Sequence, residues 1–136
     1  MRKILASILV VLTVLGVAAY AEVTSIKQDM MMIEKYAKQI KATAGDASQN
    51  QQNAVNANQI ALLLQANLQK VPDIIRQWPQ DQQPAVWQNY TEHINYAMSI
   101  AVQMQTAFQS NDNATGAALI QQLFAAKDGA HQIYNH

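Results

Sequence analysis

The chain has 136 residues, carries equal numbers of basic and acidic residues, and contains no cysteine. Without cysteine there is no disulfide, no thiolate metal site and no thioether attachment of haem. Charged residues make up only 13% of the chain, and the lysines and arginines form no stripe able to neutralise a run of phosphates, which argues against nucleic acid as a partner.

The first residues have the pattern of a bacterial secretory signal. Arg2 and Lys3 precede an apolar run over residues 4–15, and Ala19-Tyr20-Ala21 matches the small-x-small pattern of a signal peptidase site. An apolar run of about twelve residues is too short for a membrane span, which needs about twenty. We therefore expect a signal peptide over residues 1–21, export to the periplasm, and no membrane association after cleavage.

Residues 22–136 are enough for one domain with a substantial core and too few for two. They include seven basic and nine acidic residues, a net charge of −2. Gln and Asn supply most of the polarity, and we expect them on the surface, with the acidic side chains scattered outward rather than paired. Apolar residues recur at helical spacing in four segments, which predicts four amphipathic helices.

The first expected helix covers residues 23–44, and its apolar positions step alternately by three and four residues: Val23, Ile26, Met30, Ile33, Ala37, Ile40 and Ala44. The second covers residues 47–71, between a cap at Asp46 or Ser48 and a stop at Pro72. Its seam is expected at Ala54, Ala57, Ala61, Leu64, Leu68 and Val71, widened by Ile60, Leu62 and Leu63.

The link over residues 71–83 contains two prolines and many glutamines, and it is long enough to cross the end of a bundle or to carry a short turn of its own. The third expected helix covers residues 84–109 and begins at Pro84, which suits a first helical turn. Its seam repeats the spacing at Trp87, Tyr90, Ile94, Ala97, Ala101, Met104 and Phe108.

The fourth expected helix covers residues 113–134, with Asn113 as its N-cap. Two stripes run side by side along it. One consists of Leu119, Leu123, Ala126, Ala130 and Ile133, and the other of Ala117, Ile120, Phe124, Lys127, His131 and Tyr134. Lys127 and His131 interrupt the second stripe, and such polar residues on an apolar face can indicate a binding site.

Four such helices, joined by two short turns and one longer link, predict an all-α fold, an antiparallel up-down-up-down four-helix bundle. In this topology Met30 and His131 lie near the same end of the bundle, roughly 12 Å and 8 Å from it at a rise of 1.5 Å per residue. A thioether and an imidazole on opposed helices can hold haem iron from two sides.

The stretch QLFAAKDGAHQIY, residues 122–134, resembles the last helix of the cytochromes b562, periplasmic four-helix-bundle b-type cytochromes that are distantly similar to cytochromes c′. In that family the haem-ligating histidine precedes a tyrosine by three residues, as His131 precedes Tyr134 here. Met30, followed by the rest of the first seam, stands where the family places its methionine ligand.

The resemblance implies one non-covalent haem b per chain, bound between the first and last helices with Met30 and His131 as axial ligands of the iron. Cytochromes c′ attach haem through Cys-x-x-Cys-His, but Lys127 and Ala130 stand at the two cysteine positions here. Because both axial positions are filled, the implied function is electron transport in the periplasm with an unidentified redox partner, and there is no catalytic residue and no enzymatic activity.

These residues also have structural interpretations. Methionine commonly fills cores, and Met31 and Met32 are expected to point away from the seam that contains Met30. A histidine near a helix C-terminus can simply be solvated and stabilised by the helix dipole. His93 is expected at the edge of the third seam, and Lys127 is expected to extend along the edge of the bundle into solvent.

The alternative function is that of a cofactor-free periplasmic helical bundle that has lost haem, either a relic of this family or a chaperone-like binder with an exposed apolar groove. A ferritin-like di-iron site is excluded, because Glu92 is followed three residues later by Asn95 and not by histidine. The chain also contains no Gly-rich phosphate loop, serine elbow or zinc-binding helix motif.

Overall fold

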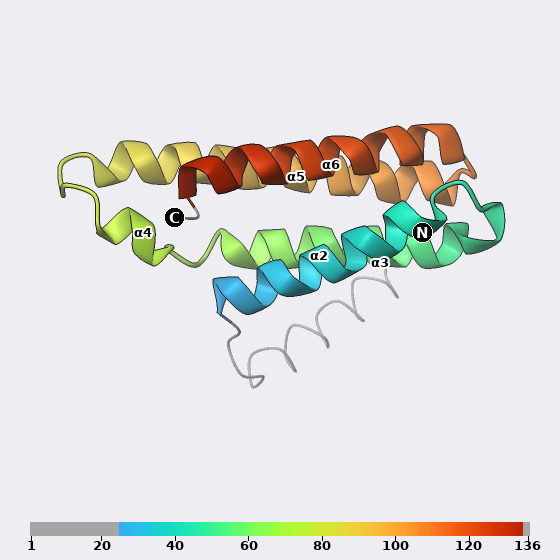
Figure 1. Cartoon of the computed structure of the whole chain (residues 1–136), viewed down its shortest axis with the longest axis horizontal. Coiled ribbons are helices and arrows are strands. Elements are labelled where there is room, and N and C mark those ends of the chain that lie inside the picture. The colour runs from blue at the N-terminus through green and yellow to red at the C-terminus, as the bar shows by residue number, and fades with distance from the viewer. Residues whose placement is uncertain (1–24, 135–136) are drawn as a thin grey trace, which may run out of the picture.

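The computed structural model describes the backbone of residues 25–134 and the side chains of residues 25–130. The expected signal peptide, residues 1–21, lies outside this range. Every regular element within it is helical: α2 (Ile26–Thr43), the short 3-10 helix η1 (Ala47–Gln49), α3 (Asn50–Asn67), α4 (Asp73–Arg76), α5 (Gln83–Gln109) and α6 (Asn113–Tyr134) (Figure 1).

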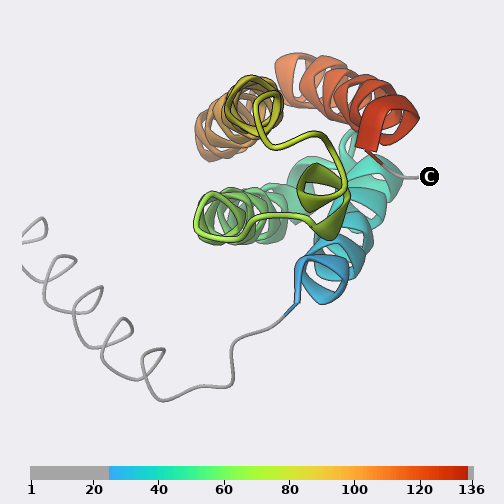
Figure 2. The same ribbon diagram turned by 90° about the vertical axis from the view of Figure 1, so that its left-hand side faces the viewer.

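The four long helices pack side by side as a helical bundle, which confirms the all-α class (Figures 1 and 2). α3 packs along α5, α5 along α6 and α2 along α3, whereas α2 and α6 contact each other much less. Seen end-on, α4 lies across one end of the bundle, where α2 begins (Figure 2). None of the described helices is long and apolar enough to cross a membrane.

α2 begins at Ile26, three residues later than expected, because Ser25 and Gln28 form a capping box. The Ser25 hydroxyl accepts a hydrogen bond from the backbone N–H of Gln28 at 3.1 Å, and the Gln28 side chain accepts one from the Ser25 N–H at 2.9 Å. This reciprocal pair satisfies two N–H groups that a helix start leaves without partners.

The second helical segment is shorter than expected at both ends. The Asp46 carboxylate accepts hydrogen bonds from the backbone N–H and the hydroxyl of Ser48, which caps η1 and delays α3 to Asn50. α3 ends at Asn67, after which the N–H groups of the next three residues bond to carbonyls three positions earlier. These tighter turns precede Pro72, which disfavours helical geometry in the residue before it.

The cap of α6 is Asp112 and not Asn113, so the predicted N-cap is wrong by one residue. Asp112 accepts hydrogen bonds from the hydroxyl of Thr115 at 2.6 Å and from its backbone N–H at 3.2 Å. These hydrogen bonds hold the pKa of Asp112 below its ordinary value. The turn from α5 places Asn111 at a φ of 58°, a left-handed conformation that asparagine tolerates well.

Asn113 instead joins the two turns at the end of the bundle opposite α4. Its amide donates to the carbonyl of Ala44 and to the side chain of Asn50, both at 2.7 Å, and the Asn50 amide donates to Asn111 and Asn113 at 3.0 Å. We call this cluster, Ala44, Asn50, Asn111 and Asn113, the closed end. It binds the α2–α3 turn to the α5–α6 turn.

The core lies along the predicted seams. Ile40, Ala57, Ile60, Ala101 and Met104 have no exposed surface. Leu119, Ile120 and Leu123 of α6 are also buried. Two side chains assigned to the second seam, Leu62 and Val71, are instead exposed, because Leu62 lies one residue round the helix from buried Ala61 and Val71 follows the end of α3.

Candidate functional site

At the end of the bundle opposite the closed end, α2 slants away from α6 (Figures 1 and 2). Side chains at this end line a cavity of about 520 Å³. Side chains of α2, α5 and α6 supply most of its lining, with Leu64 of α3 and Pro72 of the following link. The lining is mainly apolar and comprises Ile26, Lys27, Met30, Met31, Ile33, Glu34, Leu64, Pro72, Tyr90, His93, Ile94, Ala97, Leu123, Phe124, Ala126, Lys127 and Ala130.

Met30 is the partly buried methionine of this cavity. Its side chain packs against the core and lines the space between α2 and α6. Met32 is 39% exposed and does not belong to the lining, as expected. Met31 is 63% exposed, but it also touches the cavity, so only Met32 points fully away.

His131 belongs to α6 by its backbone, but its side chain lies outside the described residues. The structure therefore places only the positions leading to it. Ala126, Lys127 and Ala130 line the cavity, and His131 follows Lys127 by one helical turn. The wall of the cavity thus runs along α6 up to the residue before the histidine.

Lys127 bridges the two helices that border the cavity. Its ammonium group lies 3.2 Å from the Glu34 carboxylate of α2, which also pairs with Lys38 at 3.1 Å. Hydrogen bonds and charge attraction from Lys38 and Lys127 hold the pKa of Glu34 below its ordinary value. Lys127 thus lies partly exposed at the edge of the bundle, where it pairs with Glu34 and does not simply extend into solvent.

The aromatic ring of Phe124 lies beneath two lysine ammonium groups. The ammonium groups of Lys41 and Lys127 lie 5.0 Å and 5.9 Å from the centre of its ring, within the range of cation–π attraction. The rim of the cavity near α6 thus carries an ion-paired carboxylate and ammonium groups above an aromatic ring.

His93 was expected at the edge of the third seam, and the structure places it, half-buried, in the α5 wall of the cavity. Tyr90, one turn earlier, is 5% exposed and stacks on Trp87 with ring centres 5.6 Å apart. The spacing contained a signal for His93, because it lies three residues after Tyr90 and four before Ala97, which both line the cavity.

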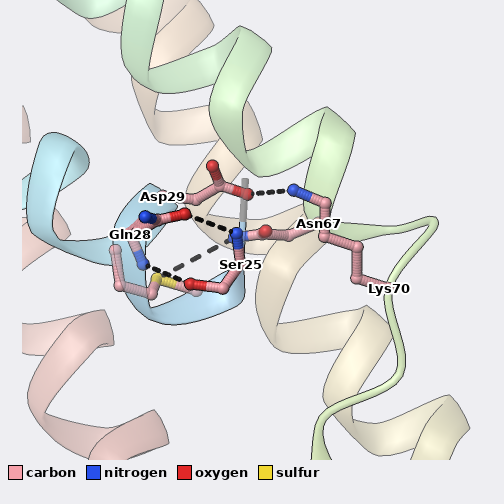
Figure 3. A network of polar contacts seen from close by, with 6 residues as sticks. Ser25, Gln28, Asp29, Asn67 and Lys70 are labelled. Carbon is pink, nitrogen blue, oxygen red and sulfur yellow. Dashed lines mark hydrogen bonds and ion pairs between the residues drawn. The ribbon is translucent and has the colours of Figure 1, made fainter. Parts of the chain in front are cut away.

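A buried ion pair stands next to Met30. Asp29 is 1% exposed, and its carboxylate accepts a hydrogen bond from the Lys70 ammonium group at 2.5 Å, which ties the start of α2 to the residues after α3 (Figure 3). The expectation that the acidic side chains point outward unpaired is wrong for this residue. Asp29 was detectable in principle, since it lies four residues before Ile33 and so shares the buried face of α2.

Asn67, the last residue of α3, completes this cluster. It has no exposed surface, and its amide nitrogen lies 4.0 Å from the sulfur of Met30, to which it donates a hydrogen bond (Figure 3). The thioether that sequence analysis selected as a ligand thus has a fixed polar neighbour.

Among the residues that the structure describes, no three His, Asp or Glu side chains converge as a metal site would require. Comparison of the chain with family models, with curated proteins and with solved structures gives no match. The cavity and the side chains around it are therefore the observations from which a function can be argued.

Proposed function

We propose that this protein is a periplasmic electron carrier that binds one non-covalent haem b, with Met30 and His131 as the axial ligands of the iron. One observation carries the proposal. A cavity between α2 and α6 is bordered by Met30 on one side and, on the other, by the α6 residues that lead directly to His131.

The residues present fit such a group. The volume of about 520 Å³ lies in the range of cofactor sites, and the lining is mainly apolar, as a porphyrin requires. Lys27 and Lys127 belong to the same lining and would supply positive charge for the two propionates, with Lys127 also paired to Glu34. With no cysteine in the chain, binding depends on packing and on the axial ligands alone.

The proposal includes the up-down-up-down order of the helices. It is supported by contacts that join the start of α2 to the end of α3, through Met30 and Asn67, and by contacts that join the two turns at the closed end. In this order α6 returns along α2, so that Met30 and His131 approach the same end of the cavity. We also propose that residues 1–21 are the export signal.

When bound, the haem would supply reversible one-electron oxidation and reduction of its iron. The Met30 thioether favours the reduced iron, which raises the potential, and the apolar lining acts in the same direction because it disfavours extra charge. Two protein ligands leave no open position for oxygen or peroxide, which suits a carrier and not an enzyme.

The first experiment is an absorption spectrum of the full chain, expressed with its N-terminal segment and purified from the periplasm. The expected protein is red, has the spectrum of low-spin haem, and changes on addition of dithionite. A protein that is colourless and stays so after addition of haemin contradicts the proposal and favours a cofactor-free bundle.

The second experiment separates the ligand from its neighbours. Met30→Ala should leave high-spin, five-coordinate haem and weakened binding, because one axial ligand is lost. Met32→Ala is the matched control, since this side chain lies outside the cavity, and it should keep the low-spin spectrum. Equal effects of both substitutions would rule out Met30 as the ligand.

A further inference from the structure

Asn67 is an exception among the buried asparagines of α3. Its amide nitrogen donates only to a thioether sulfur, a weak acceptor, and its side-chain oxygen is buried without a hydrogen-bond partner among the described residues. A thioether has no hydrogen to donate, so the amide must turn its NH₂ group toward Met30. Buried oxygens without partners are rare in folded proteins, and each one calls for an explanation.

The other three buried asparagines of this helix are satisfied at both ends. Asn53 donates to the backbone carbonyl of Thr43 and accepts from its hydroxyl. Asn56 donates to Gln39 and accepts from Gln52, and Asn50 exchanges hydrogen bonds within the closed end. These three side chains stabilise the fold, whereas Asn67 leaves an acceptor unpaired and so contributes less than an apolar residue of its size would.

We infer that Asn67 is a positioning residue for the thioether of Met30, and that its hydrogen bond raises the reduction potential of the bound haem. This inference rests on the proposed function. The sulfur carries two lone pairs, so one can receive the amide proton while the other faces the cavity. The amide restricts rotation of the flexible methionine and selects the sulfur orientation before any ligand enters.

The direction of the effect follows from charge. A hydrogen bond to the sulfur withdraws electron density that would otherwise stabilise ferric iron, and the ferrous state needs this density less. Loss of the donor should therefore favour oxidised haem and lower the potential. The Asp29 and Lys70 pair next to it anchors the same turn of α2 to the residues after α3, so that the sulfur and the amide keep their register (Figure 3).

The test compares Asn67→Leu with Asn53→Leu in the full chain. Both substitutions replace a buried asparagine of α3 by an apolar residue of similar size. Neither asparagine lines the cavity, but Asn67 contacts Met30, whereas Asn53 bonds to Thr43. For Asn67→Leu we expect the ratio of ferrous to ferric affinity to fall about tenfold, which is a potential lower by about 59 mV for one electron. Asn67→Ala removes the same donor without adding bulk and serves if leucine does not fit.

Stability of the haem-free protein is the second readout. Asn67→Leu should keep or raise Tm because it removes an unpaired buried oxygen, while Asn53→Leu should lower Tm and leave the potential unchanged. A drop in Tm as large as that of Asn53→Leu, or an equal change of potential in both variants, would show that Asn67 is structural and overturn the inference.

The two proposals fail in different ways. If the wild-type protein binds haem with low-spin iron and Asn67→Leu leaves the potential unchanged, the inference is wrong and the proposed function stands. If the wild-type protein takes up no haem, both are wrong.

Discussion

The two ends of the bundle contain the same kinds of residue, buried asparagine and phenylalanine, but differ in how these side chains are packed and hydrogen-bonded. At the closed end, Asn50 and Asn113 form a hydrogen-bonded cluster that binds two turns together, and Phe108 beside it is 1% exposed. At the cavity end, α2 and α6 stand apart, Phe124 is only half-buried, and a buried asparagine keeps one oxygen unpaired.

If the proposed function holds, stability and haem binding depend on different ends of the bundle. The asparagine side chains of the closed end are hydrogen-bonded to one another and Phe108 is buried, although a smaller, more polar cavity of about 380 Å³ also borders Phe108 and Asn50. The cavity end keeps apolar surface and a methionine sulfur available, which costs stability unless something fills the space. We therefore expect equivalent substitutions at the two ends to have unequal effects.

The two phenylalanines of the chain test this comparison most strongly. Phe108→Ala should lower the free energy of unfolding by about 3–5 kcal/mol, because removal of a ring that is 1% exposed enlarges the space inside the bundle. Phe124→Ala should cost clearly less in the haem-free protein, because its ring is only half-buried at the edge of the larger cavity. Urea unfolding of both variants without haem measures the difference.

Haem binding should respond to the same two substitutions in the opposite order. Phe124→Ala should weaken haem binding because it removes part of the cavity wall, while Phe108→Ala should affect binding only through stability. Equal losses of stability in the two variants would show that both ends are packed alike.

Haem binding should stabilise only the end of the bundle that contains the cavity. At a thousandfold excess over Kd, a ligand that binds only the folded chain adds about 4 kcal/mol, which for a domain of this size raises Tm by roughly ten degrees or more. Amide exchange should slow on addition of haemin from Lys127 onward in α6 and stay unchanged at the closed end. Full protection of the Lys127 turn without haem would contradict both the site and its coupling to folding.

Two glycines of α6 provide a matched pair with smaller effects. A Cβ on Gly116 would lie 2.5 Å from two ring carbons of Phe108, so the buried ring would have to shift and Gly116→Ala should cost about 1–3 kcal/mol. Gly129 meets nothing within 4 Å, and Gly129→Ala should stabilise the helix by up to about 1 kcal/mol. Thermal unfolding measures both, and a gain for Gly116→Ala would refute the tight packing of the closed end.

The long helices and most of the core could be predicted from the sequence, because the apolar spacing of each helix depends only on its own residues. Ile40, Ile60 and Met104 are buried as their positions on the seams predict. The exact ends depended on local hydrogen bonds, such as the Ser25 and Gln28 capping box, which the apolar pattern does not contain.

The polar contacts of the site were harder to predict from the sequence. Asn50, Asn53 and Asn67 continue the spacing of the second seam through Ala57 and its successors, so their burial could have been inferred from position. Their partners could not, because the contact of Asn67 with Met30 joins residues 37 positions apart and depends on how the two helices are aligned. The role of His131 stays a prediction.

The smallest expected effect concerns the ionic bridge across the cavity. Glu34 on α2 and Lys127 on α6 approach to 3.2 Å where the two helices otherwise have little contact, so Glu34→Gln should loosen this end of the haem-free protein. The carboxylate is 38% exposed, and screening by water limits the loss to less than about 1 kcal/mol. Glu92→Gln is the control, since the exposed Glu92 accepts a hydrogen bond from neutral Gln88 on a single helix.

The pH dependence of this loss identifies its cause. Because Lys38 and Lys127 hold the pKa of Glu34 below its ordinary value of 4.5, the ionised carboxylate is favoured more in the folded chain than in the unfolded one. The stabilisation is therefore complete above pH 4.5 and disappears as the pH falls through the lowered pKa. Urea unfolding of wild type and Glu34→Gln should differ at neutral pH and converge in acid. A difference that persists unchanged at low pH would mean that the packing of Glu34, and not its charge, holds α2 to α6.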